Sequence, residues 1–64
     1  MKIFYKKQYQ KEYEEITQKE YEEIRNKIDD KNFNEDELYH WWYLDLVDIK
    51  DNNIYVIEME TEVI

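Results

Sequence analysis

Residues 41–63 decide the fold, and they read WWYLDLVDI, then KDNN, then IYVIEMETEV. Two runs rich in β-branched and aromatic residues flank a short polar break, which is typical of a β-hairpin. Asparagine tolerates positive φ better than most residues, so we place Asn52 and Asn53 in a two-residue loop. This loop puts Ile49 opposite Val56 in the predicted hairpin.

The same register sorts the side chains of the hairpin into two faces, because successive residues of a strand alternate. It also places Asp45 opposite Glu60, and like charges directly opposite destabilise a sheet. A register shifted by one residue is the alternative, and it would move every side chain to the other face. The face predicted to cover a core collects Trp42, Leu44, Leu46, Tyr55, Ile57, Met59 and Val63. The other face collects Trp41, Tyr43, Asp45, Val47, Ile49, Val56, Glu58, Glu60 and Glu62.

Upstream of the hairpin, residues 10–16 and 18–24 carry the same heptapeptide, QKEYEEI. Two copies are too few for a solenoid, which needs at least three repeats to bury a core. The second copy follows Thr17, and Thr17 with Glu20 fits a capping box, in which each side chain bonds the other's backbone N–H. A helix is therefore predicted to begin at Gln18.

The predicted helix runs from Gln18 to Ile28, and Tyr21 and Ile24 share one face of it with Ile28. That face is predicted to pack against Leu44, Leu46, Ile57 and Met59 of the hairpin. The alternative is one longer helix from Lys6, since apolar residues upstream also keep helical spacing. In that case Thr17 would lie inside a helix, where its capping side chain has no role.

The remaining segments complete a small domain. Residues 1–9 alternate weakly and predict a strand, whose lysines suit an edge position because they discourage further pairing. Residues 29–34 predict a loop, and residues 34–40 predict one short helical turn. The order strand, helix, strand, strand predicts a single α+β domain over residues 1–64. Its small antiparallel sheet would join the N-terminal strand to the hairpin, with the helix on one face.

The composition limits the function. The net charge is −8, so we expect no direct binding to nucleic acid or to an anionic membrane. No apolar run reaches the length of a signal peptide or of a membrane span, and we expect a cytoplasmic protein. Residues with AT-rich codons supply 32 of the 64 positions, as in phages and mobile elements of low-GC bacteria, where the location would be the host cytoplasm.

The chain offers little for catalysis, and we expect it not to be an enzyme. His40 is the only histidine, and serine, cysteine and glycine are absent, which excludes Ser-His and Cys-His pairs and glycine-rich phosphate loops. The residues Asp30, Asn32, Asn34 and Asp36 resemble the beginning of a calcium-binding loop in spacing. The loop's glycine and bidentate glutamate are missing, so no metal or cofactor is expected.

The strongest candidate surface is the row Glu58, Glu60 and Glu62. In a strand these carboxylates project from one side at intervals of about 6.6–6.8 Å, similar to the spacing of phosphates along a nucleic-acid strand. Tryptophan and tyrosine are enriched among interface hot spots, so Trp41 and Tyr43 are candidate anchors. The plain alternative is a solvated strand face. The predicted partner-binding residues are Trp41, Tyr43, Asp45, Glu58, Glu60 and Glu62.

In size, charge and aromatic content the chain resembles small phage inhibitors that present carboxylates where DNA presents phosphates. Some anti-CRISPR, antirestriction and uracil-DNA glycosylase inhibitors act in this way. The resemblance implies a non-enzymatic inhibitor, encoded by a phage or mobile element, that occupies the basic nucleic-acid-binding site of a host protein. The alternative is a small structural or regulatory interaction module that acts as a homodimer through its hairpin.

Overall fold

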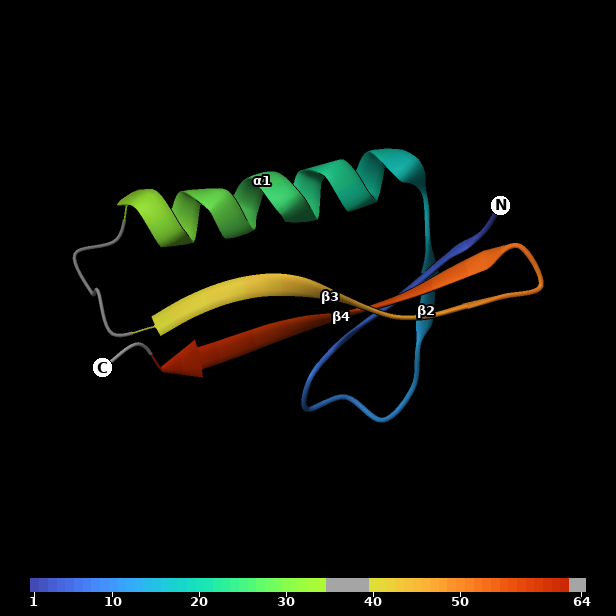
Figure 1. Cartoon of the computed structure of the whole chain (residues 1–64). Helices are drawn as coiled ribbons and strands as arrows, with labels where there is room; N and C mark the ends of the chain where they lie inside the picture. Colours follow the sequence, from blue (N-terminus) through green and yellow to red (C-terminus); the bar gives the residue numbers. More distant parts are fainter. Residues whose placement is uncertain (35–39, 63–64) are drawn as a thin grey trace.

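The computed structural model describes residues 1–34 and 40–62. One helix lies along one face of a four-stranded sheet, which confirms the α+β class (Figure 1). The strand order in the sheet is β2-β1-β4-β3. The elements in chain order are β1 (Ile3–Lys7), β2 (Glu14–Ile16), α1 (Gln18–Asn34), β3 (His40–Lys50) and β4 (Asn53–Glu62).

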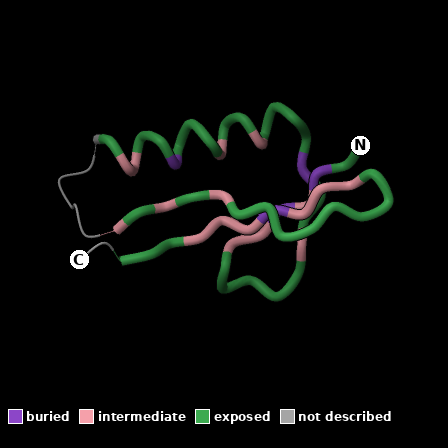
Figure 2. Tube along the Cα trace, viewed as in Figure 1, coloured by how far each residue is buried: buried purple, intermediate pink, exposed green. Residues whose placement is uncertain are grey.

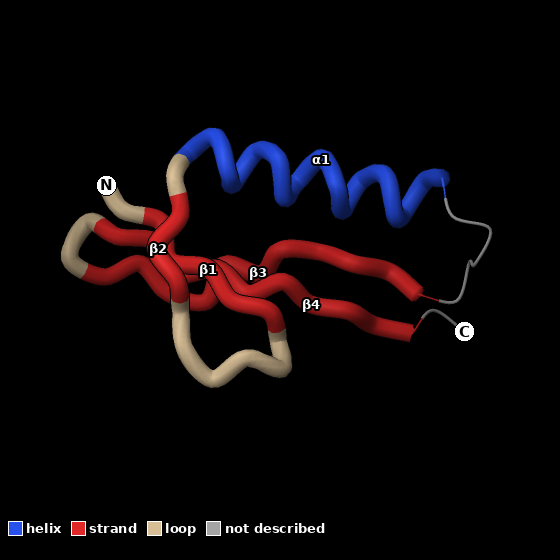
Figure 3. Tube along the Cα trace, turned by 180° about the vertical axis from the view of Figure 1, so that it is seen from behind, coloured by secondary structure: helices blue, strands red, loops and turns tan. Residues whose placement is uncertain are grey.

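The sheet is mixed rather than wholly antiparallel, because β1 runs parallel to β4. The prediction missed the short strand β2, which pairs antiparallel with β1. Each helix or strand runs in the opposite direction to the element before it. The additional strand β2 therefore reverses the direction of every later element relative to β1, including β4. The same strand covers the outer side of β1, so β1 lies inside the sheet and its predicted edge position is wrong (Figure 3).

The helix begins where the capping box placed it. The hydroxyl of Thr17 accepts a hydrogen bond from the N–H of Glu20, and the Glu20 carboxylate accepts one from the N–H of Thr17. The helix continues to Asn34, past the predicted end at Ile28, so the loop predicted for residues 29–34 is wrong. Contacts made by Asn32 with β3 hold this last part against the sheet.

The other predictions for this half of the chain have different outcomes. The longer helix beginning at Lys6 is wrong, because Lys6 and Lys7 belong to β1. The helical turn predicted for residues 34–40 lies mostly outside the described residues. Asn34 itself ends α1 and His40 begins β3.

The two copies of the heptapeptide adopt different structures. In the first copy, residues 14–16 form β2 and Ile16 is buried. The second copy forms the first two turns of α1. Only the second copy has a cap before it, whereas the first lies beside β1 and pairs with it. Identical local propensity is therefore overridden by the neighbours of each copy.

The predicted register of the hairpin is wrong by two residues at the turn. Asp51 and Asn52 form the loop, with φ values of 52° and 62°, and this pair of positive angles is typical of a type I′ turn. Lys50 therefore lies opposite Asn53. A bulge at Val47 then shifts the register by one more residue.

This bulge and the loop together separate the two acids that the prediction placed opposite each other. Asp45 lies opposite Ile57, and Glu60 lies opposite Trp42. The repulsion expected between Asp45 and Glu60 is therefore absent from the folded hairpin. The observed register also places different residues of β4 on the face toward the helix than the predicted register does.

The core lies between α1 and the sheet, toward the β2 end, as the buried positions in Figure 2 show. Ile28 of α1 is buried as well as the central cluster. The buried side chains of that cluster are Ile3, Tyr5, Ile16 and Val56, with Tyr21, Ile24, Leu44 and Ile54 packed around them. The predicted helix face and Leu44 are confirmed as core-facing. Ile57 and Met59 are not, because they alternate with the buried Val56 and lie on the other face. Leu46 is exposed.

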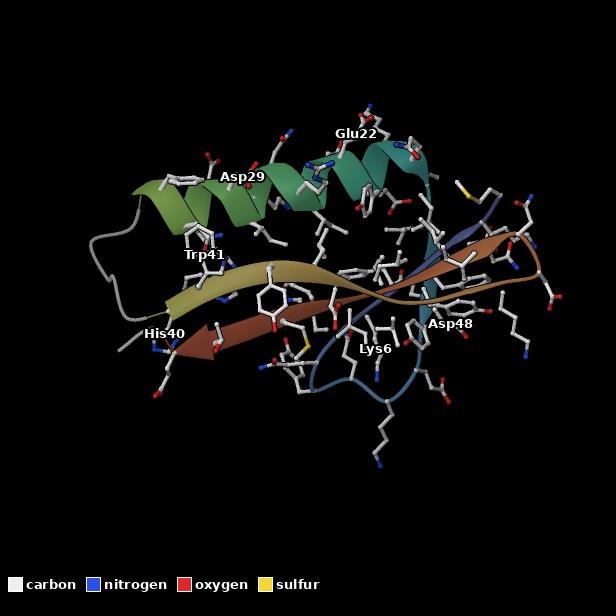
Figure 4. All side chains as sticks on the ribbon, viewed as in Figure 1. Lys6, Glu22, Asp29, His40, Trp41 and Asp48 are labelled. Carbon is white, nitrogen blue, oxygen red and sulfur yellow. The ribbon has the colours of Figure 1, made fainter. Side chains whose placement is uncertain are left out.

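The face of the sheet away from α1 carries an aromatic cluster. The rings of Phe4 and Tyr55 stack with centroids 5.0 Å apart, and Tyr13 meets Tyr55 edge-on at 5.2 Å. The ammonium of Lys6 lies 5.4 Å from the centre of the Tyr13 ring, and Figure 4 shows Lys6 on this side. The segment between β1 and β2 thus partly covers this face.

Candidate interaction surface

A cavity of about 360 Å³ opens between α1 and the edge strand β3. Four of its nine lining residues are aromatic, and both predicted anchors, Trp41 and Tyr43, line it and remain exposed at the surface. Figure 4 shows Trp41 between the end of α1 and the beginning of β3. The lining residues are Tyr21, Arg25, Ile28, Asp29, Asn32, Trp41, Trp42, Tyr43 and Leu44.

Asn32 joins α1 to the outer edge of β3. Its side-chain amide donates to the carbonyl of Trp42 at 2.7 Å, and its side-chain oxygen accepts from the N–H of Trp42 at 2.9 Å. The carboxamide therefore pairs with the strand as a neighbouring strand would. The sequence placed Asn32 only in a calcium-loop spacing and did not predict its pairing with β3, although its position four residues after Ile28 keeps it near the apolar side of the helix.

A lysine and a phenylalanine contact the two tryptophans that line the cavity. The ammonium of Lys31 lies 5.4 Å from the centre of the Trp42 ring, within the range of a cation–π contact. The rings of Phe33 and Trp41 meet edge-on at 5.8 Å. These contacts fix the orientation of both tryptophans at the beginning of β3.

The helix carries carboxylates on the side next to this cavity. Asp29 lines the cavity, and Glu22 lies two helical turns earlier on the same side, since seven residues make almost two turns. Figure 4 shows Glu22 projecting from α1 into solvent. Arg25 lies between them on the helix surface and lines the cavity too. Sequence reasoning missed this acidic side because it treated the helix only as a support for the core.

The row Glu58, Glu60 and Glu62 lies on a different face from the one predicted. These residues alternate with Ile57 and Met59, so they share the face of the buried Val56, which is the helix side. Asp45 and Tyr43 share the opposite face. The structure therefore does not bring Asp45 and Tyr43 together with the glutamate row.

Glu58 is half-buried and takes part in the fold. Its carboxylate accepts a hydrogen bond from the Tyr5 hydroxyl at 3.0 Å. It lines a second cavity, of about 260 Å³, together with three lysines: Lys7, Lys27 and Lys31. Burial raises the pKa of the Tyr5 hydroxyl well above its usual value, and the charge of Glu58 raises it further.

Replacing Tyr5 by phenylalanine is expected to destabilise the protein by about 1–2 kcal/mol at neutral pH, because a half-buried carboxylate loses its donor. The difference should persist up to about pH 10, where free tyrosine ionises. It should shrink at higher pH, because the unfolded chain then ionises Tyr5 while the folded chain, with the raised pKa, still holds the proton. Urea unfolding of both proteins between neutral and alkaline pH measures it. A difference in the free energy of unfolding that stays the same at every pH would contradict the raised pKa of Tyr5 and its hydrogen bond to Glu58.

Glu60 contacts the ring of His40, and the N–H of Glu60 donates to the side chain of Gln8 at 3.1 Å. The rings of His40 and Trp42 stack with centroids 5.8 Å apart. His40 is thus held at the end of the hairpin by aromatic and carboxylate neighbours. Glu62 is exposed at the end of β4.

The described residues hold no group of three or more His, Cys, Asp or Glu side chains that could bind a metal ion. The calcium-loop spacing falls on a helix at Asp30 and Asn32, and Asn32 is already bonded to Trp42. Asp36 lies outside the described residues. Neither of the two helix-lined cavities is shaped by a glycine-rich loop, since the chain has no glycine.

No helix in residues 1–34 or 40–62 is both long and apolar enough to cross a membrane.

Comparison with models of protein families, with curated proteins and with solved structures found no match to this chain.

Proposed function

We propose that this chain is a small acidic inhibitor without catalytic activity, encoded by a phage or mobile element, that occupies the basic nucleic-acid-binding site of a host protein. The observation that carries the proposal is the exposure of its acids. Within the described ranges, Glu58 is half-buried and every other Asp and Glu is exposed. The negative charge of these described acids therefore acts on molecules around the protein rather than inside its fold, in a chain whose net charge is −8.

Exposed aromatic side chains lie beside the acids. Trp41 and Tyr43 line the cavity next to Asp29, and they supply apolar contact area where the partner's charges are desolvated. Long-range attraction between this acidic surface and a basic site speeds association, and salt weakens it. These two features together support competition with a nucleic acid for the same basic site.

The proposal predicts salt-dependent capture of a nucleic-acid-binding protein. The immobilised chain is exposed to an extract of a low-GC bacterium at about 50 mM and about 500 mM salt. We expect retention at low salt, loss at high salt, and displacement of the retained protein by duplex DNA. Retention that is unaffected by both salt and DNA would contradict the proposal.

The carboxylates are then tested in pairs, omitting Glu58 because it supports the fold. Replacing Glu60 and Glu62 by glutamine should weaken binding to the captured protein by roughly ten-fold or more, since losing one side of a buried charge pair costs about 2–5 kcal/mol. Glu12→Gln with Glu14→Gln removes the same charge from exposed positions near β2 and is the control. Both double variants should keep the circular dichroism spectrum of the parent. If they then bind with equal affinity, Glu60 and Glu62 do not belong to the binding surface.

A homodimer through the hairpin is the second candidate. The observation that favours it is the position of β3 at the edge of the sheet, with exposed apolar residues on it. Sedimentation equilibrium at micromolar concentration separates the two candidates, because a monomer across this range excludes the dimer.

A further inference from the structure

In the part of the chain that the structure describes, α1 bonds the outer edge of β3 at one end, at Trp42. Asn32 bonds both the N–H and the C=O of Trp42, so these two groups point away from β4. In an antiparallel pair, alternate residues point their backbone groups to the same side. Leu44 therefore presents its N–H and C=O to the outer edge as well, next to the cavity that it lines. We use the name free edge for residues 44–49 of β3, which pair with no other strand on this side and in which only the N–H of Ile49 has a side-chain acceptor among the described residues, the carboxylate of Asp48.

The free edge is also apolar. Leu46 is 53% exposed, Val47 50% and Ile49 64%. Figure 1 shows why: the β3–β4 turn projects past the beginning of α1, so the helix does not cover this part of the hairpin. Proteins usually protect a long edge strand with lysines or prolines, because unpaired backbone groups attract another strand. Here Lys50 stands only at the end, after Ile49.

The charges beside the free edge define what can pair with it. Asp45 and Asp48 are both exposed, and the Asp48 carboxylate bonds the N–H of Ile49 at 2.8 Å. Figure 4 shows Asp48 on the projecting part of the hairpin. A basic strand would place lysine or arginine side chains opposite these acids, which stabilises a strand pair. A second copy would do the opposite, because antiparallel pairing centred between Leu46 and Val47 puts Asp45 against Asp48.

We infer that the free edge binds an extended basic segment of the partner protein by strand addition. The backbone of Leu44 supplies the first hydrogen bonds, the exposed apolar side chains contact alternate residues of the added strand, and the two aspartates select its charge. This inference rests on the proposed function and names the part of a basic partner that the chain recognises.

The test uses a fluorescent decapeptide of alternating lysine and valine, with a glutamate–valine decapeptide as the charge control. We expect the basic peptide to bind the full chain and the acidic peptide not to bind. Amide hydrogen exchange should slow at Leu44, since its N–H becomes bonded to the added strand. Binding without protection of Leu44 would overturn the inference.

Matched variants locate the contact. Leu46→Thr with Ile49→Thr keeps β-forming residues and charge, and it should weaken peptide binding by roughly ten-fold. Asp45→Asn with Asp48→Asn should weaken it and reduce its salt dependence. Glu12→Gln with Glu14→Gln removes the same charge from exposed positions near β2, at the opposite edge of the sheet from β3, and should change affinity far less.

The outcomes separate this inference from the proposed function. If the variant with Glu12→Gln and Glu14→Gln loses as much affinity as the aspartate variant, binding is only general charge attraction, and the strand addition is wrong while an acidic docking surface stands. If no variant and no salt concentration changes the binding, both fail. A dimer of the parent chain that dissociates in Leu46→Thr with Ile49→Thr would show that a second copy occupies the edge, and would overturn the inference.

Discussion

Replacing Ile3 by alanine is expected to unfold most of the protein at room temperature. Ile3 is 4% exposed, and it lies in β1 between Ile16 of β2 and Ile54 of β4. Truncating a buried isoleucine to alanine costs about 2–5 kcal/mol through lost burial and the cavity left behind. A single core in a chain this short rarely supplies more than about 3–5 kcal/mol. The loss is therefore comparable with the whole stability of the fold.

The matched control is Ile49→Ala, the same chemical change in a strand. Ile49 is 64% exposed, so its truncation should cost less than about 1 kcal/mol. Urea unfolding followed by tryptophan fluorescence and far-ultraviolet circular dichroism measures both variants. Equal losses for the two isoleucines would mean that Ile3 does not lie at the centre of the core.

Replacing Asn32 by alanine is expected to destabilise the protein by about 1–3 kcal/mol and to open the edge of β3 at Trp42. The substitution removes the side-chain donor that bonds the Trp42 carbonyl and the side-chain acceptor that bonds the Trp42 N–H. Loss of partners for part-buried polar groups costs about this amount. Hydrogen exchange at the Trp42 amide should accelerate by more than the change in global stability explains.

Two comparisons make this prediction specific. Asn26→Ala replaces an exposed asparagine of the same helix and should be neutral or stabilising, because alanine favours helix. Asn32→Asp keeps an acceptor for the Trp42 N–H but places a carboxylate near the Trp42 carbonyl, so it should also destabilise. If Asn32→Ala and Asn26→Ala have the same effect on unfolding and on exchange, the side-chain pairing with β3 contributes nothing.

Short-range signals predicted the parts of the fold that depend on a few neighbouring residues. The pair Thr17 and Glu20 placed the beginning of α1, because both hydrogen bonds of the cap lie within four residues. The polar break after Lys50 placed the hairpin, and Tyr21 and Ile24 gave the core-facing side of the helix. Each of these features needs no information from distant parts of the chain.

The prediction was wrong at the features that depend on contacts between distant parts of the chain. The loop formed at Asp51 and Asn52 rather than one residue later, and the bulge at Val47 has no local sequence signal. Because the side-chain period of a strand is two, the two-residue shift of the pairing at the loop leaves each face unchanged. The further one-residue shift at the bulge moved Glu58 to the helix side and left Asp45 on the other face. The missed strand β2 changed the direction of β4 relative to β1.

The candidate surface divides in the same way. The amino-acid sequence by itself determined the excess of acids, the absence of serine, cysteine and glycine, and the presence of two adjacent tryptophans. The tertiary structure alone decided that Asn32 covers one end of the β3 edge and that, among the described residues, no strand pairs with the outer side of residues 44–49. The two copies of QKEYEEI show why the amino-acid sequence of a short segment does not determine these features. The same seven residues end in a strand beside β1 and form a helix after Thr17, because burial and pairing partners outweigh local preference.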